Sequence, residues 1–481
     1  MPRQNRVKSI NPVAIIQNIC YNELMNMDEL KPKPNSTDKG AKLIEGSVGK
    51  TLVNLTIPMI VGIMGMVAFN LVDTFFVGQL GTTQLAAMSF TFPIVLVIGS
   101  ISMGLGVGAA AVISRAIGEG DRHKVQRLTT DALSLSLIIV ISFVVLGLLT
   151  IGPLFRLMGA SPALLPYIKK YMTIWYPGVA FVIIPMVGNN AIRATGDTKT
   201  PSMIMLAAVA VNMVLDPLLI FGIGPFPRWG LQGAAAATVA ARATTLMVAL
   251  RILHGREKMI SFAPPPLKEA VLSWRKILYI GLPAAGTNLI IPVSMGVITY
   301  LVSTYGKEAV AALGVATRVE AFSLTVVMAL SSVLTPFIGQ NLGAGRMDRI
   351  KRAVKLSRRF ALAWGGVVFI IFFMWARPIA QLFNDHPAVI SAVVSYLLMV
   401  SVSYGFAGVL VLSGSAFNAL NKPMPAAVLS ILRMVVLYIP VALVGSYFWQ
   451  LKGIFVGAAT ANVLAGTAAI FWLNRTLRKK S

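Results

Sequence analysis

The stretch from Thr51 to Gly81 constrains this chain most, because it is apolar for long enough to cross a bilayer. It also contains Pro58 and Asp73. A carboxylate inside a membrane helix costs about 3 kcal/mol or more unless it is protonated, paired or hydrated. A proline removes a helical hydrogen bond and bends the helix. The stretch therefore predicts a membrane helix that bends at Pro58 and carries a functional carboxyl group at Asp73.

Similar apolar stretches follow along the whole chain of 481 residues, of which 56% are hydrophobic and 12% are charged. Soluble domains carry about 25% charged residues. We therefore predict an all-α polytopic membrane protein with twelve transmembrane helices. The expected spans are residues 51–77, 85–114, 129–152, 168–193, 200–224, 231–253, 277–303, 309–340, 357–376, 390–418, 424–447 and 452–474.

The charge distribution predicts the topology. The net charge is +25, and the loops on one side hold only seven of the 42 Lys and Arg residues. Three more lie within spans: Arg242, Arg318 and Arg433. Basic residues concentrate on the cytoplasmic side of membrane proteins. We therefore expect a multi-pass cell-membrane protein with both termini in the cytoplasm, whose basic loops meet membrane lipid headgroups rather than nucleic acid.

Several other classes of protein are disfavoured. The single cysteine, Cys20, allows no disulfide framework, and the three histidines lack metal-ligand spacing. Gly49-Lys50-Thr51 resembles the end of a phosphate-binding loop, but the first glycine of that motif is missing and no strand precedes it. We expect no enzymatic activity and no cofactor.

An internal repeat with an offset of 225 residues relates the two halves of the chain. Two six-helix halves that enter the membrane in the same direction place a central ligand site at their interface, which is a transporter plan. We expect a protein that works as a monomer, with a cytoplasmic tail at 1–46, an N-lobe at 47–253, a linker at 254–276, a C-lobe at 277–475 and a basic tail at 476–481. The pairs that show the repeat include Pro58 and Pro283, Gly81 and Gly306, Gly118 and Gly343, and Tyr171 and Tyr396.

Four polar residues of the first half are predicted to form one cluster. Asn212 and Asp216 are four residues apart and share a face of their helix. Counted from the nearest span ends, Asp73, Asp216 and Thr238 all lie roughly 8–12 Å inside the same side of the membrane, at about 1.5 Å per residue. The chemistry of the cluster is therefore two carboxylates, one amide and one hydroxyl.

The second half lacks these acids, although it repeats the scaffold. Ile298 takes the place of Asp73, and Ile439 takes that of Asp216. Two carboxylates in one low-dielectric site cannot easily both ionise, so the pair is expected to titrate together. The oxygen-rich cluster can take up H⁺ or hold a hard cation such as Na⁺, and the sequence is compatible with either coupling ion.

Three further residues are weaker candidates for a substrate cavity. Glu320 either contacts a cationic substrate or pairs with a basic group such as Arg318, Arg242 or Arg433. Asn189 and Asn190, near the middle of the fourth span, either line the cavity of the first half or hydrogen-bond between helices.

The chain resembles the multidrug and toxic compound extrusion (MATE) transporters from about residue 47 to 475. The resemblance is carried by LTIPMIVG at 55–62, FNLVDTFFVGQLG at 69–81, NMVLDPLLIFG at 212–222 and GAAAAT at 233–238. Within the family it is most similar to the DinF-like branch. The other large branch uses acids in spans 7 and 10, which this sequence lacks.

The resemblance implies twelve helices in two lobes and export by alternating access. It implies a coupling site at Asp73, Asn212, Asp216 and Thr238, with a bend of the first span at Pro58 linked to protonation. A tyrosine often found four residues before the first aspartate is Phe69 here, which places Phe69 at the cavity without that hydroxyl. We predict a secondary antiporter that exports amphipathic, often cationic drugs in exchange for H⁺ or Na⁺. The alternative is an exporter or flippase of a lipid-linked or metabolite substrate on a related fold.

Overall fold

A computed structural model of the chain describes residues 41–261 and 266–479, and every regular element in them is a helix. Residues 1–40 of the predicted tail and residues 262–265 of the predicted linker lie outside the described part. The first half contains α2 (Val48–Gly78), α3 (Thr82–Glu119), α4 (Arg122–Leu157), α5 (Leu165–Gly178), α6 (Ala180–Ala194), α7 (Lys199–Phe221), α8 (Leu231–Arg251) and the π-helix η1 (Ile252–Arg256).

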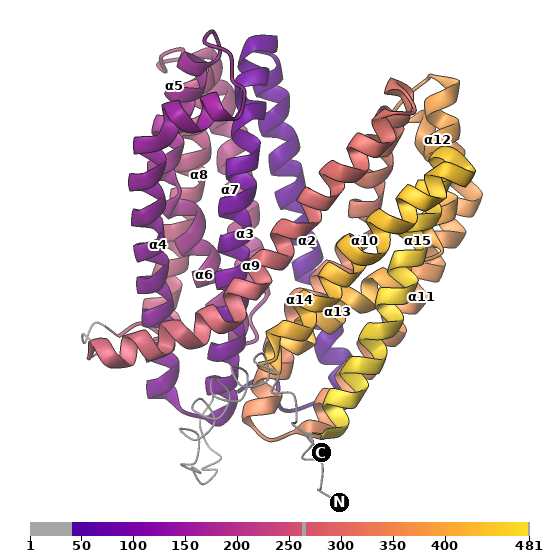
Figure 1. The fold of residues 1–481 in the computed structure, drawn as a ribbon. Coiled ribbons are helices and arrows are strands. Elements are labelled where there is room, and N and C mark those ends of the chain that lie inside the picture. The colour runs from indigo at the N-terminus through magenta and orange to yellow at the C-terminus, as the bar shows by residue number, and fades with distance from the viewer. Residues whose placement is uncertain (1–40, 262–265, 480–481) are drawn as a thin grey trace, which may run out of the picture. The chain divides into compact units, whose positions relative to one another are not determined.

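The second half repeats this order (Figure 1). It contains α9 (Leu267–Ser303), α10 (Lys307–Gly343), α11 (Met347–Gln381), α12 (Pro387–Ser401), α13 (Tyr404–Ala419), α14 (Pro423–Ile431), the π-helix η2 (Leu432–Tyr438) and α15 (Ile439–Lys479).

These helices account for the twelve predicted spans. Ten helical segments are long and apolar enough to cross a membrane, and α12 with α13, bent by 58°, forms an eleventh span. The last segment, Pro423–Lys479, has 57 residues and is interrupted by non-helical backbone at Trp449 and Gln450, so it holds two spans. The helices run past the predicted boundaries: α9 begins inside the expected linker, and α15 continues into the expected C-terminal tail.

We call the side on which α2 begins and α15 ends the tail side, which is at the bottom of Figure 1, and the opposite side the far side. The far side carries the turns at Gly81, Gly230 and Gly306, where all three glycines have positive φ values. A residue with a side chain is strained in that backbone conformation, which explains why glycine occupies the turn before α3, α8 and α10.

The first helix of each half crosses from one lobe to the other. In the first part of α2, Val48, Leu52 and Met59 are buried in a core built mainly by α10, α11, α13 and α15 of the C-lobe. The last part of α2 joins the N-lobe, where Val77 is in the core and the Phe76 ring lies 6.2 Å from that of Phe221 on α7. The two ends of α2 therefore contribute side chains to the cores of different lobes.

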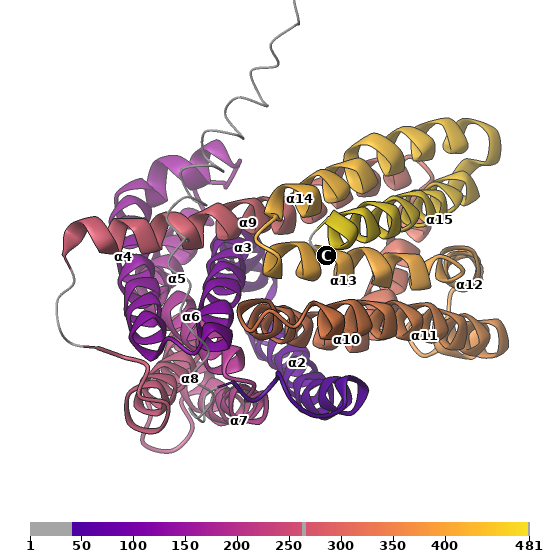
Figure 2. The same ribbon diagram turned by 90° about the horizontal axis from the view of Figure 1, so that it is seen from below.

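The helix α9 makes the corresponding crossing in the opposite sense. Ile277 is buried in the N-lobe core, whereas Ile298 and Val302 are buried in the C-lobe core. Seen from the tail side, α9 runs from α4 past α3 to α14 (Figure 2). Gly104 of α3 and Gly281 of α9 allow this approach, because a Cβ at either position would overlap backbone of the other helix. Pro58 and Pro283 each lie close to the point where their helix leaves the opposite lobe.

The lobes are also joined on the tail side, where α3 packs on α10. A Cβ at Gly118 would overlap the carbonyl oxygen of Gln340, and a Cβ at Gly343 would overlap that of Arg115. The fully buried Gln340 donates from Nε2 to the carbonyl of Ala194 (2.7 Å) and accepts from the backbone N–H of Leu43 (3.0 Å). One side chain thus connects α6 of the N-lobe, α10 of the C-lobe and the segment before α2.

Gln340→Ala is expected to loosen this tail-side junction. Truncation leaves the Ala194 carbonyl and the Leu43 N–H unpaired in a buried place, at a cost of about 1–3 kcal/mol for each group. A reporter cysteine at Ser114, which is buried beside Gly339, should then react faster with a membrane-impermeant maleimide in a chain whose Cys20 is replaced by serine. Equal labelling rates in the two proteins would contradict this role for Gln340.

Candidate functional site

The four residues predicted to cluster come from three helices of the N-lobe, and the structure brings them together. Asp216 and Asn212 on α7 are both fully buried, and Asn212 Nδ2 donates to Asp216 Oδ1 at 3.0 Å. Asp73 on α2 is 9% exposed, accepts a hydrogen bond from the Thr238 hydroxyl on α8 and interacts electrostatically with Asp216. We call these four residues the N-lobe site.

The N-lobe site has more acceptors than donors. Asp73 Oδ1, Asp216 Oδ2 and Asn212 Oδ1 are buried, and none has a hydrogen-bond partner among the described residues. A buried oxygen without a partner costs free energy, and a buried charge costs more. A proton shared by the carboxylates or a small hard cation held by the oxygens would remove that cost. The donor set of carboxylate, amide and hydroxyl oxygens fits Na⁺ as well as H⁺.

Arg242 is a member of this region that the sequence analysis had placed among possible partners of Glu320. In the structure it interacts electrostatically with Asp73, and its Cζ lies 4.8 Å from the centre of the Phe69 ring. Phe69 is one turn before Asp73, and Arg242 is one turn after Thr238. Because α2 and α8 run in opposite directions, both residues lie one turn nearer the tail side. The two spacings of four residues were the available sequence signal.

Tyr171 on α5 is a second residue that the sequence analysis did not assign to the site. It is 4% exposed and interacts electrostatically with both Asp73 and Asp216. Its only sequence signal was the repeat, in which it corresponds to Tyr396. The predicted bend residue, Pro58, lies inside α2, which continues as a helix on both sides of it.

The asparagines of the fourth span differ in their contacts. Asn190 Nδ2 donates to the carbonyl of Met186 (2.8 Å) in its own helix and packs where a Cβ on Gly106 of α3 would overlap it. This favours the helix-packing interpretation for Asn190. Asn189 is also buried, but its Oδ1 has no partner among the described residues.

An open apolar depression lies between α2 and α7. It has a volume of about 490 Å³ and is lined by Val72, Phe75 and Phe76 of α2 and by Met213 of α7. Val72 directly precedes Asp73, and Met213 directly follows Asn212. Binding sites for small molecules are typically 300–1,000 Å³ and mostly apolar, with a few polar groups at one end.

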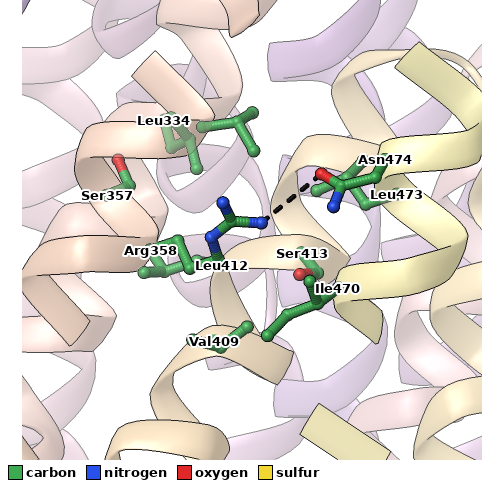
Figure 3. A pocket seen from close by; sticks show the side chains of 10 residues that line it. Leu334, Ser357, Arg358, Val409, Leu412, Ser413, Ile470, Leu473 and Asn474 are labelled. Carbon is green, nitrogen blue, oxygen red and sulfur yellow. Dashed lines mark hydrogen bonds between the residues drawn. The ribbon is translucent and has the colours of Figure 1, made fainter. Parts of the chain in front are cut away.

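A second, much smaller pocket lies in the C-lobe among α10, α11, α13 and α15 (Figure 3). The guanidinium of Arg358 points into it and donates to Asn474 Oδ1 at 3.4 Å. It has room for about one water molecule, so it cannot hold an organic substrate.

Comparison with known proteins gives consistent results. The sequence model of the MatE family matches residues 58–218 and 283–444. The two matches begin at Pro58 and Pro283, which are related by the repeat. The chain is 41% identical to a protein named FAD transporter from Shewanella oneidensis over 90% of this chain and 96% of that protein. It is 25% identical to the probable multidrug resistance protein YoeA of Bacillus subtilis, over 90% and 94%.

Solved structures agree with the fold. The chain superimposes on the Vibrio cholerae MATE transporter VcmN in the bent form with a TM-score of 0.85 and 31% identity, covering 90% of this chain and 98% of VcmN. A structure titled as the outward-facing conformation of a multidrug resistance MATE family transporter gives a TM-score of 0.85 at 25% identity, over 93% and 99%.

Proposed function

Since this chain belongs to the MatE family of membrane transporters, we propose that it exports an anionic flavin dinucleotide by alternating access between the two lobes. The relative at 41% identity is named an FAD transporter, whereas the relatives named for multidrug resistance are 25% identical or less. Within this proposal the tail side faces the cytoplasm, and a single chain is the transporting unit.

The position of Arg242 is the main structural support for an anionic cargo. Flavin adenine dinucleotide contains two aromatic ring systems joined through a pyrophosphate that is negatively charged at neutral pH. A guanidinium is well suited to phosphate, since it donates two parallel hydrogen bonds. Arg242 lies against Phe69 and interacts with Asp73 at the N-lobe site. A positive group here favours an anion over a cationic drug.

Binding of H⁺ or Na⁺ at the N-lobe site then controls this arginine. While Asp73 is ionised, its charge attracts Arg242. A proton or cation on the carboxylates weakens that attraction and frees the guanidinium for phosphate. Cargo and coupling ion therefore bind cooperatively. An inside-negative membrane potential drives such an anion outward, by about 2.3 kcal/mol per charge for every 100 mV.

Drug/cation antiport is the second candidate, and the unpartnered oxygens of Asp73 and Asp216 favour it. A cationic drug would compete with H⁺ or Na⁺ for these carboxylates, as the sequence analysis predicts. The two candidates thus differ in the sign of the coupling. Acidification raises the affinity for the dinucleotide and lowers the affinity for a cationic drug.

Transport by purified protein in proteoliposomes tests the choice. We expect export of flavin adenine dinucleotide to follow an imposed inside-negative potential, and its binding to strengthen between pH 8 and pH 6. A fluorescent cationic dye serves as the comparison cargo. Exchange of the dye for H⁺ or Na⁺, with no movement of the dinucleotide, would reject the flavin proposal in favour of the antiporter.

A further inference from the structure

The C-lobe contains a buried polar group that the coupling mechanism does not use. Glu320 on α10 accepts a hydrogen bond from the hydroxyl group of Tyr396 on α12, and Tyr404 on α13 interacts electrostatically with the same carboxylate. Arg433 and Tyr438 of η2 both interact electrostatically with the same carboxylate. We call these five residues the C-lobe site.

The π-helix η2 is what directs two of these residues at Glu320. Arg433 and Tyr438 are five positions apart. In an α-helix they would point about 140° apart, at 100° per residue. In a π-helix, which closes its hydrogen bonds between residues i and i+5, they share a face. Such segments are frequent at functional sites, since they are less favourable than α-helix and need a compensating gain.

The internal repeat relates this group to the N-lobe site. Tyr396 corresponds to Tyr171, which lies beside Asp73 and Asp216. Each lobe thus places an equivalent tyrosine beside a carboxylate and an arginine within electrostatic range of it. The carboxylates themselves are not equivalent in sequence. The C-lobe therefore has a polar site of its own, although the acids of the first half are not repeated.

The charges of the C-lobe site are separated rather than paired. Arg433 interacts with Glu320 at a distance, and the ion pairs of the described residues include none between them. Both side chains are partly exposed, whereas Tyr396, Tyr404 and Tyr438 are buried. The acceptor of Glu320 and the donors of Arg433 are thus partly accessible, and the Phe455 ring packs 5.0 Å from the ring of Tyr396.

This combination selects among ligand groups. A cationic group would be repelled by Arg433, and a phosphate would be repelled by Glu320. A neutral planar heterocycle fits both, if it carries an N–H beside a carbonyl oxygen or ring nitrogen. The carboxylate accepts from the N–H, the guanidinium donates to the neighbouring acceptor, and the aromatic side chains contact the ring faces.

We propose that the C-lobe site binds such a ring of the cargo, either the isoalloxazine ring or the adenine ring of a flavin dinucleotide. This inference rests on the proposed function, and it assigns ring recognition to the C-lobe and phosphate recognition to Arg242 in the N-lobe. Both rings present an N–H beside an acceptor, so fragments of the dinucleotide must distinguish them.

Binding to the purified full-length protein tests the proposal. The probes are flavin adenine dinucleotide, riboflavin, adenosine and inorganic pyrophosphate. Glu320→Gln and Arg433→Gln are each expected to lower the affinity for the dinucleotide by about 10-fold, because each loses one hydrogen bond that involves a charged group. The affinity for either riboflavin or adenosine should fall by the same factor, and the fragment affected identifies the ring that the C-lobe site binds. The affinity for pyrophosphate should equal that of the wild type.

Matched variants separate recognition from folding. Arg318→Gln removes a basic residue from an exposed position two residues from Glu320 and should leave every affinity unchanged. Tyr396→Phe keeps the ring and removes one hydroxyl donor, so it should lower the affinity for the same ring fragment. Thermal unfolding of each variant shows whether the fold is kept.

The outcomes distinguish this inference from the proposed function. Wild-type affinity of Glu320→Gln and Arg433→Gln for the dinucleotide and both ring fragments would overturn the C-lobe assignment while the exporter proposal stands. An equal loss of affinity for pyrophosphate would also overturn the C-lobe assignment, because a purely structural role of these residues affects the binding of all ligands alike. Failure of the wild-type protein to bind the dinucleotide would reject the proposed function itself, and the C-lobe assignment with it.

Discussion

Asp73→Asn is expected to abolish the dependence of transport on pH and on Na⁺. The substitution keeps the size of the side chain and removes its titratable charge, so Arg242 is permanently released from it. A free-energy coupling between ion and cargo typically amounts to about 5- to 150-fold in affinity. We therefore expect the roughly 10- to 100-fold change in cargo affinity across the titration range to disappear. Binding of cargo to the purified protein between pH 5.5 and pH 8.5 measures it.

The matched control for this variant is Asp385→Asn, in the exposed loop between α11 and α12. It removes the same charge away from the N-lobe site and should keep the wild-type pH profile. Thermal unfolding of Asp73→Asn shows whether the fold is kept, since removing one partner of a buried pair of charges can cost about 3–5 kcal/mol. A folded Asp73→Asn protein that retains the full pH dependence would show that the coupling ion binds elsewhere.

Arg242→Gln is expected to change the choice of cargo. The guanidinium lies against the Phe69 ring and interacts with Asp73, so its removal takes away the positive charge that opposes the two carboxylates of the N-lobe site. Loss of a hydrogen bond to a charged group costs about 1.5–3 kcal/mol, which is roughly 10- to 150-fold in affinity for a phosphate-bearing cargo. Affinity for a cationic dye should rise, since the carboxylates then attract it without opposition.

Two further variants test whether the effect on cargo affinity depends on the position of the charge and on the planar shape of the guanidinium. Arg242→Lys keeps the charge but not the planar fork of donors, so it should recover only part of the dinucleotide affinity. Arg318→Gln removes a positive charge from an exposed position of α10 and should change neither cargo. Unchanged affinity for the dinucleotide in Arg242→Gln would remove the main support for an anionic cargo.

Span number, the repeat and the acid cluster were accessible from the sequence because each follows from local rules. Apolar length determines a span, and the distance along a helix determines depth. Asn212 and Asp216 share a helix face whatever surrounds them. Asp73, Asp216 and Thr238 could therefore be brought together from counting alone, and the structure confirms that they are neighbours.

The contacts of Arg242 and the π-helix η2 were not accessible in this way. Which partner a buried arginine selects depends on the rotation of α8 relative to α2, and packing sets that rotation. A π-helix differs from an α-helix only in that its backbone hydrogen bonds join residues five apart rather than four. Apart from Arg433 and Tyr438, the residues of Leu432–Tyr438 are apolar and give no signal of that difference. The crossing of α2 and α9 was missed for a similar reason, since hydropathy assigns a helix to the membrane but not to a lobe.

That crossing has a consequence for how such a chain could arise. A half-length ancestor with the same packing could bury only the later part of its first helix in its own bundle, because the earlier part packs in the core of the other one. Two identical halves would have had to exchange the first parts of these helices, as in a domain-swapped dimer with two-fold symmetry. Fusion into one chain then made the exchange intramolecular, and the two copies became free to diverge into the unlike polar groups that the lobes now carry.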